Sequence, residues 1–226
     1  MARAATARDA LAAAGIPAER LGHARLERLS HAERTFCRWI LRRFEAGRAP
    51  VPSALAEEAG RLELELGAAL SLLAREDLVH VEGGEVVVAY PFSGRRTAHR
   101  VRLDGREVYA MCAIDALGMA PMLGRSIEVV SRDPVGDEEV RVSLTADGRT
   151  AWQPREAVVL AGRSCEGEAF RGCCQVLNFF ASTASAERYV RERPEVRGFP
   201  ISIPDAVEAG RLVFGEILEL GAAGAR

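Results

Sequence analysis

Residues 109–125 read Tyr-Ala-Met-Cys-Ala-Ile-Asp-Ala-Leu-Gly-Met-Ala-Pro-Met-Leu-Gly-Arg, an apolar run that carries one cysteine and one carboxylate. Glu107-Val108-Tyr109 is typical of a strand end, so the sequence places Cys112 where a strand gives way to a helix. In a helix over 110–117, Cys112 and Asp115 lie on one face and one turn apart, close enough to act on one bound atom. The stretch therefore predicts a strand-to-helix junction that carries a reactive site.

A second source of sulfur lies downstream, where Cys173 and Cys174 are followed by Asn-Phe-Phe-Ala-Ser at 178–182. Thiolates bind soft metal ions, and a nearby carboxylate can take a proton from a thiol or deliver one to a leaving group. The apolar stretch 173–181 fits either a strand or a buried turn. Adjacent residues on an extended strand point to opposite faces, so we expect only one of these two cysteines to reach the site. The residues predict a thiophilic-metal site built from Cys112, Asp115 and one later cysteine.

Composition limits the class of protein. The chain has 226 residues, 48% of them hydrophobic, which is enough for one large domain or two small ones. Its formal charge of -2 gives no overall attraction for nucleic acid or for an anionic membrane. No apolar run reaches the roughly 20 residues of a spanning helix, and the N-terminus lacks the apolar core of a secretion signal, so we expect a cytoplasmic protein. The five cysteines form no repeated Cys-x-x-Cys pattern, which argues against a disulfide framework.

The first part of the chain is predicted to be helical. Ser30 and Glu33 form a capping-box pattern before a helix, and further helices are expected over 53–59 and 62–75. A hairpin with a Gly-Gly turn is expected over 78–88. Three helices and a hairpin resemble a winged helix. The candidate recognition helix is net acidic, however, so we do not expect it to bind nucleic acid.

The second part is predicted to be mostly strands. Strands are expected over 98–103, 126–131, 139–144 and 157–160, followed by helices over 184–192 and after Asp205. Strands and helices do not alternate regularly. The predicted fold class is therefore α+β, with a winged-helix-like helical domain over residues 1–88 and a mixed-sheet catalytic domain over 89–226.

The sequence resembles the organomercurial (alkylmercury) lyase family. The resemblance rests on the segment Asp-Gly-Arg-Glu-Val-Tyr-Ala-Met-Cys-Ala-Ile-Asp-Ala-Leu at 104–117, with Gly124-Arg125 after it, and on the Cys-Cys pair at 173–174 with Phe-Phe-Ala-Ser at 179–182. It covers roughly residues 30–215 and includes the winged-helix-like region. We expect Phe92, Tyr109, Phe179 and Phe180 to line or back an apolar pocket.

The resemblance implies a cofactor-free protonolysis of a carbon–mercury bond. It gives Cys112 as one thiolate, Asp115 as the proton carrier and Cys173 as the second thiolate, with Cys174 as the alternative because the spacing to Phe179 is one residue longer than usual. The implied substrate is an organomercurial, and the bound product is Hg(II). Small thiols or a mercuric reductase are the implied acceptors.

Two other functions fit the same residues. One is a lyase-fold enzyme that acts on a substrate without mercury. The other is a metal or thiol sensor whose winged helix binds DNA. Of the remaining cysteines, Cys37 is expected in the core and Cys165 in an exposed loop.

Overall fold

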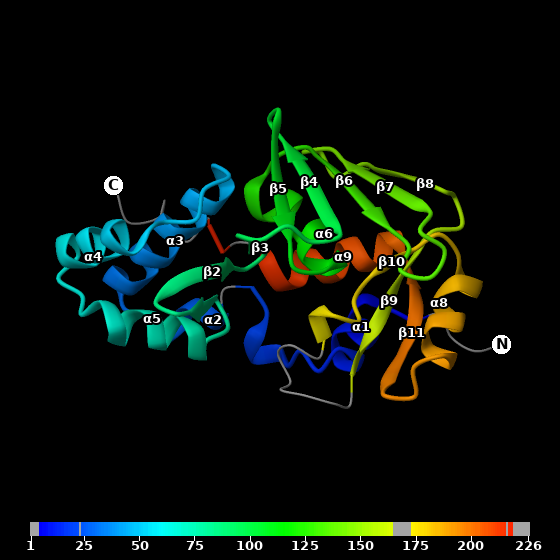
Figure 1. Ribbon diagram of the computed structural model, residues 1–226, viewed down its shortest axis with the longest axis horizontal. Helices are drawn as coiled ribbons and strands as arrows, with labels where there is room; N and C mark the ends of the chain where they lie inside the picture. The colour runs from blue at the N-terminus through cyan, green and yellow to red at the C-terminus, as the bar shows by residue number, and fades with distance from the viewer. Residues whose placement is uncertain (1–4, 23, 165–172, 216, 219–226) are drawn as a thin grey trace.

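The computed structural model describes residues 5–22, 24–164, 173–215 and 217–218. Cys165 falls outside these residues. The molecule is elongated, with the helices of residues 24–75 and the hairpin of residues 79–89 at one end, and the remaining strands with their covering helices at the other (Figure 1). Within the described residues, no helix combines the length and apolar character needed to cross a lipid bilayer.

Helices precede the first strand. They are α1 (Ala7–Ala13), the 3-10 turn η1 (Ala18–Arg20), α2 (Ala24–Glu27), α3 (His31–Glu45), α4 (Pro52–Arg61) and α5 (Leu66–Arg75). The predicted capping box is confirmed at α3, where the Glu33 N–H donates to Ser30 Oγ (3.2 Å) and the Ser30 N–H donates to the Glu33 carboxylate (2.7 Å). The helix predicted from Leu62 begins only at Leu66, because Glu63 takes a left-handed φ of 57° that a helix does not allow.

The strands form two sheets. The larger has the order β1-β2-β3-β5-β4-β6-β7-β8 and the smaller β10-β9-β11. Their bounds are β1 (Val79–Glu82), β2 (Glu85–Ala89), β3 (Phe92–Ser93), β4 (His99–Leu103), β5 (Arg106–Ala110), β6 (Ile127–Arg132), β7 (Glu139–Leu144), β8 (Thr150–Gln153), β9 (Val158–Ser164), β10 (Phe179–Phe180) and β11 (Val196–Ser202). The α+β class is confirmed.

The prediction of a mixed sheet was wrong, because every pairing between described strands is antiparallel. Parallel neighbours need a crossover that returns a strand beside its predecessor. Here α6 (Ala113–Leu123) crosses from β5 to β6, but β4 lies between these two strands and is antiparallel to both. The alternation of apolar and polar residues along each strand does not show that β4 lies between β5 and β6.

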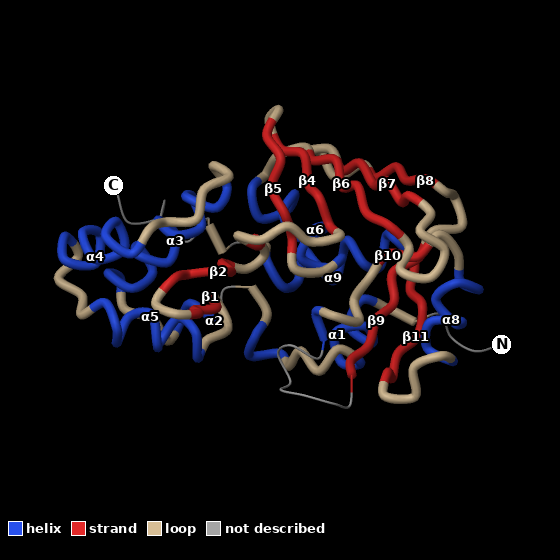
Figure 2. Tube along the Cα trace, in the orientation of Figure 1, coloured by secondary structure: helices blue, strands red, loops and turns tan. Residues whose placement is uncertain are grey.

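Helix α6 is the centre of the larger region. It lies under β4, β5 and β6 and packs against α9 (Ile203–Phe214), so that the curved sheet covers both helices (Figures 1 and 2). The two helices approach closely at Gly118 and Gly210, where a Cβ on Gly210 would lie 2.7 Å from the Gly118 nitrogen. Helix α8 (Thr183–Arg191) packs on β9 and β11.

The predicted domain boundary at 88/89 falls inside β2. This strand pairs with β3, with Val88 opposite Ser93, and β3 pairs with β5, with Phe92 opposite Ala110. The hairpin of the helical region thus continues into the sheet that leads to Cys112. Helix α1 lies against α9, β9 and β11, far along the chain (Figure 1). The two-domain division and the winged-helix comparison stay predictions.

Candidate active site

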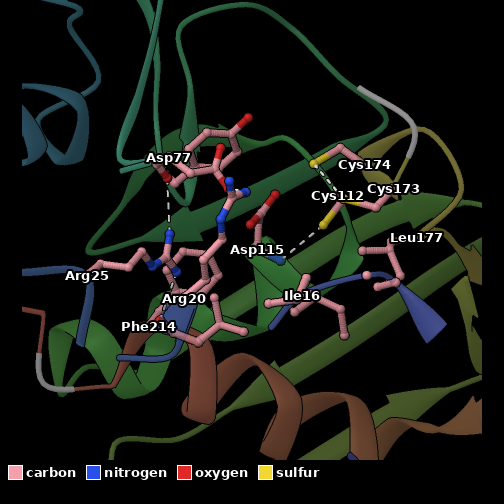
Figure 3. Close-up of a pocket in the computed structure, with 15 residues that line it drawn as sticks. Ile16, Arg20, Arg25, Asp77, Cys112, Asp115, Cys173, Cys174, Leu177 and Phe214 are labelled. Carbon is pink, nitrogen blue, oxygen red and sulfur yellow. Dashed lines mark hydrogen bonds and ion pairs between the residues drawn. The ribbon is translucent and has the colours of Figure 1, made fainter. Parts of the chain in front are cut away.

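A pocket lies at the N-terminal end of α6 and joins residues from distant parts of the chain. Its apolar wall comprises Ile16, Ile114, Leu177, Val213 and Phe214, and its polar wall comprises Arg20, Arg25, Asp77 and Tyr90. The same pocket holds Cys112, Asp115, Cys173 and Cys174 (Figure 3). The residues predicted from sequence to carry the chemistry are therefore brought together in one cavity.

Cys112 caps α6. Its backbone is extended, with φ -147° and ψ 178°, and the Asp115 N–H donates to its sulfur at 3.4 Å. Serine and threonine oxygens accept the same bond in ordinary N-caps. The cap fixes the Cys112 sulfur at the positive end of the helix, where the helix dipole favours negative charge.

Asp115 follows one turn later and is buried. Its Oδ2 atom has no hydrogen-bond partner among the described residues. Burial raises the pKa of this carboxyl from 3.8 to about 7, while Cys112 and the positive charge of Arg25 act to lower it. A carboxyl with this pKa can both accept and give up a proton near neutral pH.

Cys173 and Cys174 lie in a short helical turn rather than on a strand. The Leu177 N–H donates to the Cys173 carbonyl (3.0 Å), and the Ala113 N–H donates to the Leu177 carbonyl (2.8 Å), which ties this turn to the start of α6. Side chains of adjacent residues in a helix diverge by about 100° rather than 180°. Both cysteines therefore line the pocket, contrary to the expectation that only one would.

The structure groups Cys174, not Cys173, with the other two residues. The Cys112 and Cys174 sulfurs and an Asp115 carboxylate oxygen all lie within 4.8 Å of one another. Cys173 Sγ lies 4.0 Å from Cys174 Sγ. The geometry thus favours Cys174, the alternative prediction, over Cys173, the preferred one, as the partner of Cys112. The choice of Cys173 or Cys174 as the second thiolate stays a prediction.

The three thiols are held in their neutral form. Burial raises the pKa of the Cys112 thiol to about 12, and the negative charge of Asp115 adds to that rise. The pKa of Cys174 is raised chiefly by its hydrogen bond with Cys112, and that of Cys173 by its hydrogen bond with Cys174. At rest the site therefore stores protons on sulfur, which a soft metal ion displaces when it binds.

The polar wall was not predicted from sequence. Arg25 is buried, donates to the carbonyls of Asp77 (3.1 Å) and Val213 (3.0 Å), and places its Cζ 5.4 Å from the centre of the Phe214 ring. Arg20 forms an ion pair with the Asp77 carboxylate at 2.9 Å. The sequence gives only a weak signal for this role, a single arginine next to apolar Leu26 in a short helix.

The four aromatic residues that were expected to line or back the pocket are not among the residues that line it. Phe92, Phe179 and Phe180 are buried in the core and do not line the site pocket, and Tyr109 donates its hydroxyl to Glu107 outside it. The aromatic residues that line the pocket are Tyr90 and Phe214. Cys37 is buried in the core, as predicted.

Comparisons with known proteins agree on one family. A family model described as MerB, alkylmercury lyase, matches residues 92–215. An alkylmercury lyase of Staphylococcus epidermidis is 31% identical over 164 residues, which cover 72% of this chain and 74% of that protein. An alkylmercury lyase of Bacillus cereus is 31% identical over 118 residues, which cover 52% of this chain and 53% of that protein.

A solved structure also matches. The crystal structure of the mercury-bound form of MerB2 superimposes with a TM-score of 0.69 and covers 86% of this chain and 95% of its own. The sequence identity is 21%, so this comparison shows that the fold is shared.

Proposed function

This chain belongs to the alkylmercury lyase family, and we propose that Cys112, Asp115 and Cys174 carry out its cleavage of the carbon–mercury bond. The observation that carries this assignment is the group of two sulfurs and one carboxylate oxygen that lie within 4.8 Å of one another. If each metal–sulfur bond is about 2.3 Å long, as for zinc, two sulfurs on opposite sides of one ion lie roughly 4.6 Å apart. The 4.8 Å limit on the distance between the two sulfurs is therefore compatible with one mercury atom bonded to both.

The first step replaces a ligand on mercury. For a substrate R–Hg–X, the Cys112 sulfur bonds to mercury, the bond from mercury to X breaks, and X leaves with the thiol proton as HX. Metal binding displaces protons from thiols even when their pKa is high. The Asp115 carboxylate lies beside this sulfur and can carry the proton away.

The second step breaks the carbon–mercury bond. The Cys174 thiol passes its proton to the Asp115 carboxylate, which delivers it to the carbon, and the bonding electron pair leaves mercury with that carbon. A bond from Cys174 sulfur to mercury forms at the same time. The balance is R–Hg–X plus two thiols giving R–H, HX and Hg(II) on two thiolates. Because the pKa of Asp115 is about 7, the carboxyl can work in both directions.

The pocket walls support this chemistry in different ways. The apolar wall, including Ile16 and Leu177, suits the hydrocarbon group of the substrate and excludes water from the proton transfer. The charge of Arg25 stabilises ionised Asp115 after it has released its proton.

Side chains supply every proton and protein ligand in this reaction, so it needs no cofactor. Hg(II) leaves to a small thiol or to the cysteines of a mercuric reductase. The reaction requires reduced thiols, the state that the cytoplasm maintains, and we propose that compartment for it.

The test is turnover of phenylmercury by the full chain in excess small thiol, with benzene and Hg(II) measured over time. We expect sustained benzene release, reduced by about 10²–10⁴-fold in Asp115→Asn, the range for loss of a general acid. Cys112→Ser and Cys174→Ser should lose turnover, whereas the control Cys37→Ala, with its thiol in the core, should keep it. Full turnover by Cys174→Ser together with loss in Cys173→Ser would reverse the assignment of the second thiolate.

A further inference from the structure

Cys173 adds a third sulfur beside the proposed pair. Its Sγ lies 4.0 Å from Cys174 Sγ, and both line the pocket that holds Cys112 and Asp115. Figure 3 draws the three sulfur-bearing side chains next to one another at one side of the pocket, with Asp115 beside them. The proposed cleavage uses only two of these thiols, so the third has no part in it.

The three thiols differ in their exposure. Cys112 is 2% exposed, whereas Cys173 and Cys174 are half-buried. A metal ion bonded to Cys112 and Cys174 is thus held partly by the most buried of the three thiols. A metal ion bonded to Cys173 and Cys174 is held by two thiols that both lie nearer to solvent.

We propose that Cys173 is a transfer ligand, which moves Hg(II) from the buried Cys112–Cys174 pair to the outer Cys173–Cys174 pair before it leaves the protein. This inference rests on the proposed function. In the transfer step the Cys173 sulfur bonds to mercury, the bond from mercury to Cys112 breaks, and the Cys173 proton passes through Asp115 to the Cys112 sulfur. No atom is oxidised or reduced. The number of thiolates on mercury is two before and after.

The geometry allows the exchange. Mercury stays on Cys174 throughout, and 4.0 Å between the Cys173 and Cys174 sulfurs is close to the roughly 4.6 Å that two bonds of about 2.3 Å span in a straight line. A slight bend at the metal or a small side-chain rotation accommodates the difference. A thiol held at this distance also acts at a far higher effective concentration than a thiol in solution.

The transfer separates Hg(II) release from bond cleavage. In a single turnover of phenylmercury with excess small thiol, we expect Cys173→Ser to release benzene within about twofold of the wild-type rate. Its release of Hg(II) should be slower by roughly tenfold or more, the scale on which a residue supporting a metal site acts. Cys37→Ala is the control for removal of a thiol outside the pocket and should leave both rates unchanged. Equal Hg(II) release by wild type and Cys173→Ser would overturn the proposal.

A second measurement tests the outer pair without catalysis. Cys112→Ser loaded with one equivalent of inorganic Hg(II) should show two sulfur ligands by X-ray absorption, and Cys112→Ser/Cys173→Ser should show one. Two protein sulfurs in the double variant would also overturn the proposal. If the wild-type protein releases no benzene while the sulfur counts come out as expected, the proposed function fails but the outer pair stands as a metal site.

Discussion

Replacement of Asp115 by asparagine should make the folded protein more stable at high pH while it slows cleavage by about 10²–10⁴-fold. The side chain is buried, and its Oδ2 has no hydrogen-bond partner among the described residues. The folded state therefore holds the ionised carboxyl at a cost. Asparagine keeps the shape of the side chain and removes the charge, so Asp115→Asn removes that cost.

The magnitude follows from the pKa. A rise of the Asp115 pKa from 3.8 to about 7 corresponds to about 4 kcal/mol of lost folding free energy once the carboxyl is ionised in both states. The sign follows from proton binding. Below pH 3.8 the carboxyl is protonated in both states and costs nothing; between pH 3.8 and about 7 the folded state binds the extra proton, so stability falls as pH rises. The loss is about 2 kcal/mol at pH 5 and about 4 kcal/mol at pH 8.

The assay is chemical denaturation of both proteins at pH 5 and pH 8. The buried amide has its own desolvation cost, but that cost is the same at both pH values. The diagnostic quantity is therefore the change with pH: the advantage of Asp115→Asn in unfolding free energy should grow by about 2–3 kcal/mol from pH 5 to pH 8.

The matched control is Asp137→Asn, at a carboxyl whose side chain is 82% exposed and paired with Arg132. Asparagine tolerates the left-handed φ of 57° at that position. We expect its effect to stay within about 0.5 kcal/mol at either pH. An advantage of Asp115→Asn that is flat or shrinks between pH 5 and pH 8 would refute a buried, raised-pKa carboxyl, and with it the proton-carrier role proposed for Asp115.

Three further perturbations test other parts of the structure. Arg25→Met removes a positive charge that lowers the pKa of Asp115. The pH midpoint of single-turnover benzene release should therefore move upward in Arg25→Met and return to the wild-type value in Arg25→Lys. An unmoved midpoint would show that Arg25 only supports the fold. Gly210→Ala places a Cβ 2.7 Å from the Gly118 backbone and should lower the free energy of unfolding by about 1–3 kcal/mol or more. Chemical denaturation measures this change. An unchanged denaturation midpoint would contradict the close packing of α6 on α9. Ser30→Ala removes the cap of α3 and should cost about 1 kcal/mol of stability with benzene release unchanged, so altered release would mean that this helix influences the site.

Local patterns predicted the local structure. The capping box at Ser30, the hairpin with its Gly83–Gly84 turn and the strand-to-helix junction at Cys112 all depend on residues within a few positions of one another. The sequence did not predict the features whose partners lie far apart in the chain. The order of β3, β4, β5 and β6 and the pairing of β11 with β9 depend on contacts that alternation along one strand does not report.

The sequence by itself carried the resemblance to the family. The segment at 104–117 and the cysteine pair before Phe-Phe-Ala-Ser resemble the alkylmercury lyases, and the comparisons confirm that family. The candidate metal-binding residues can be recognised in the sequence because residue type and helical spacing decide which groups can share one metal ion.

Only the tertiary structure decided how these groups are aimed. Whether Cys173 or Cys174 joins Cys112 depends on a helical turn held by the bond from the Ala113 N–H to the Leu177 carbonyl, which joins segments far apart in sequence. The raised pKa of Asp115 and the presence of Arg25 likewise depend on burial by α2, α6 and α9 together. The spacing of residues in the sequence determines which side chains are neighbours on one helix or strand. The direction in which those side chains point, and how deeply they are buried, depend on the packing of several elements together.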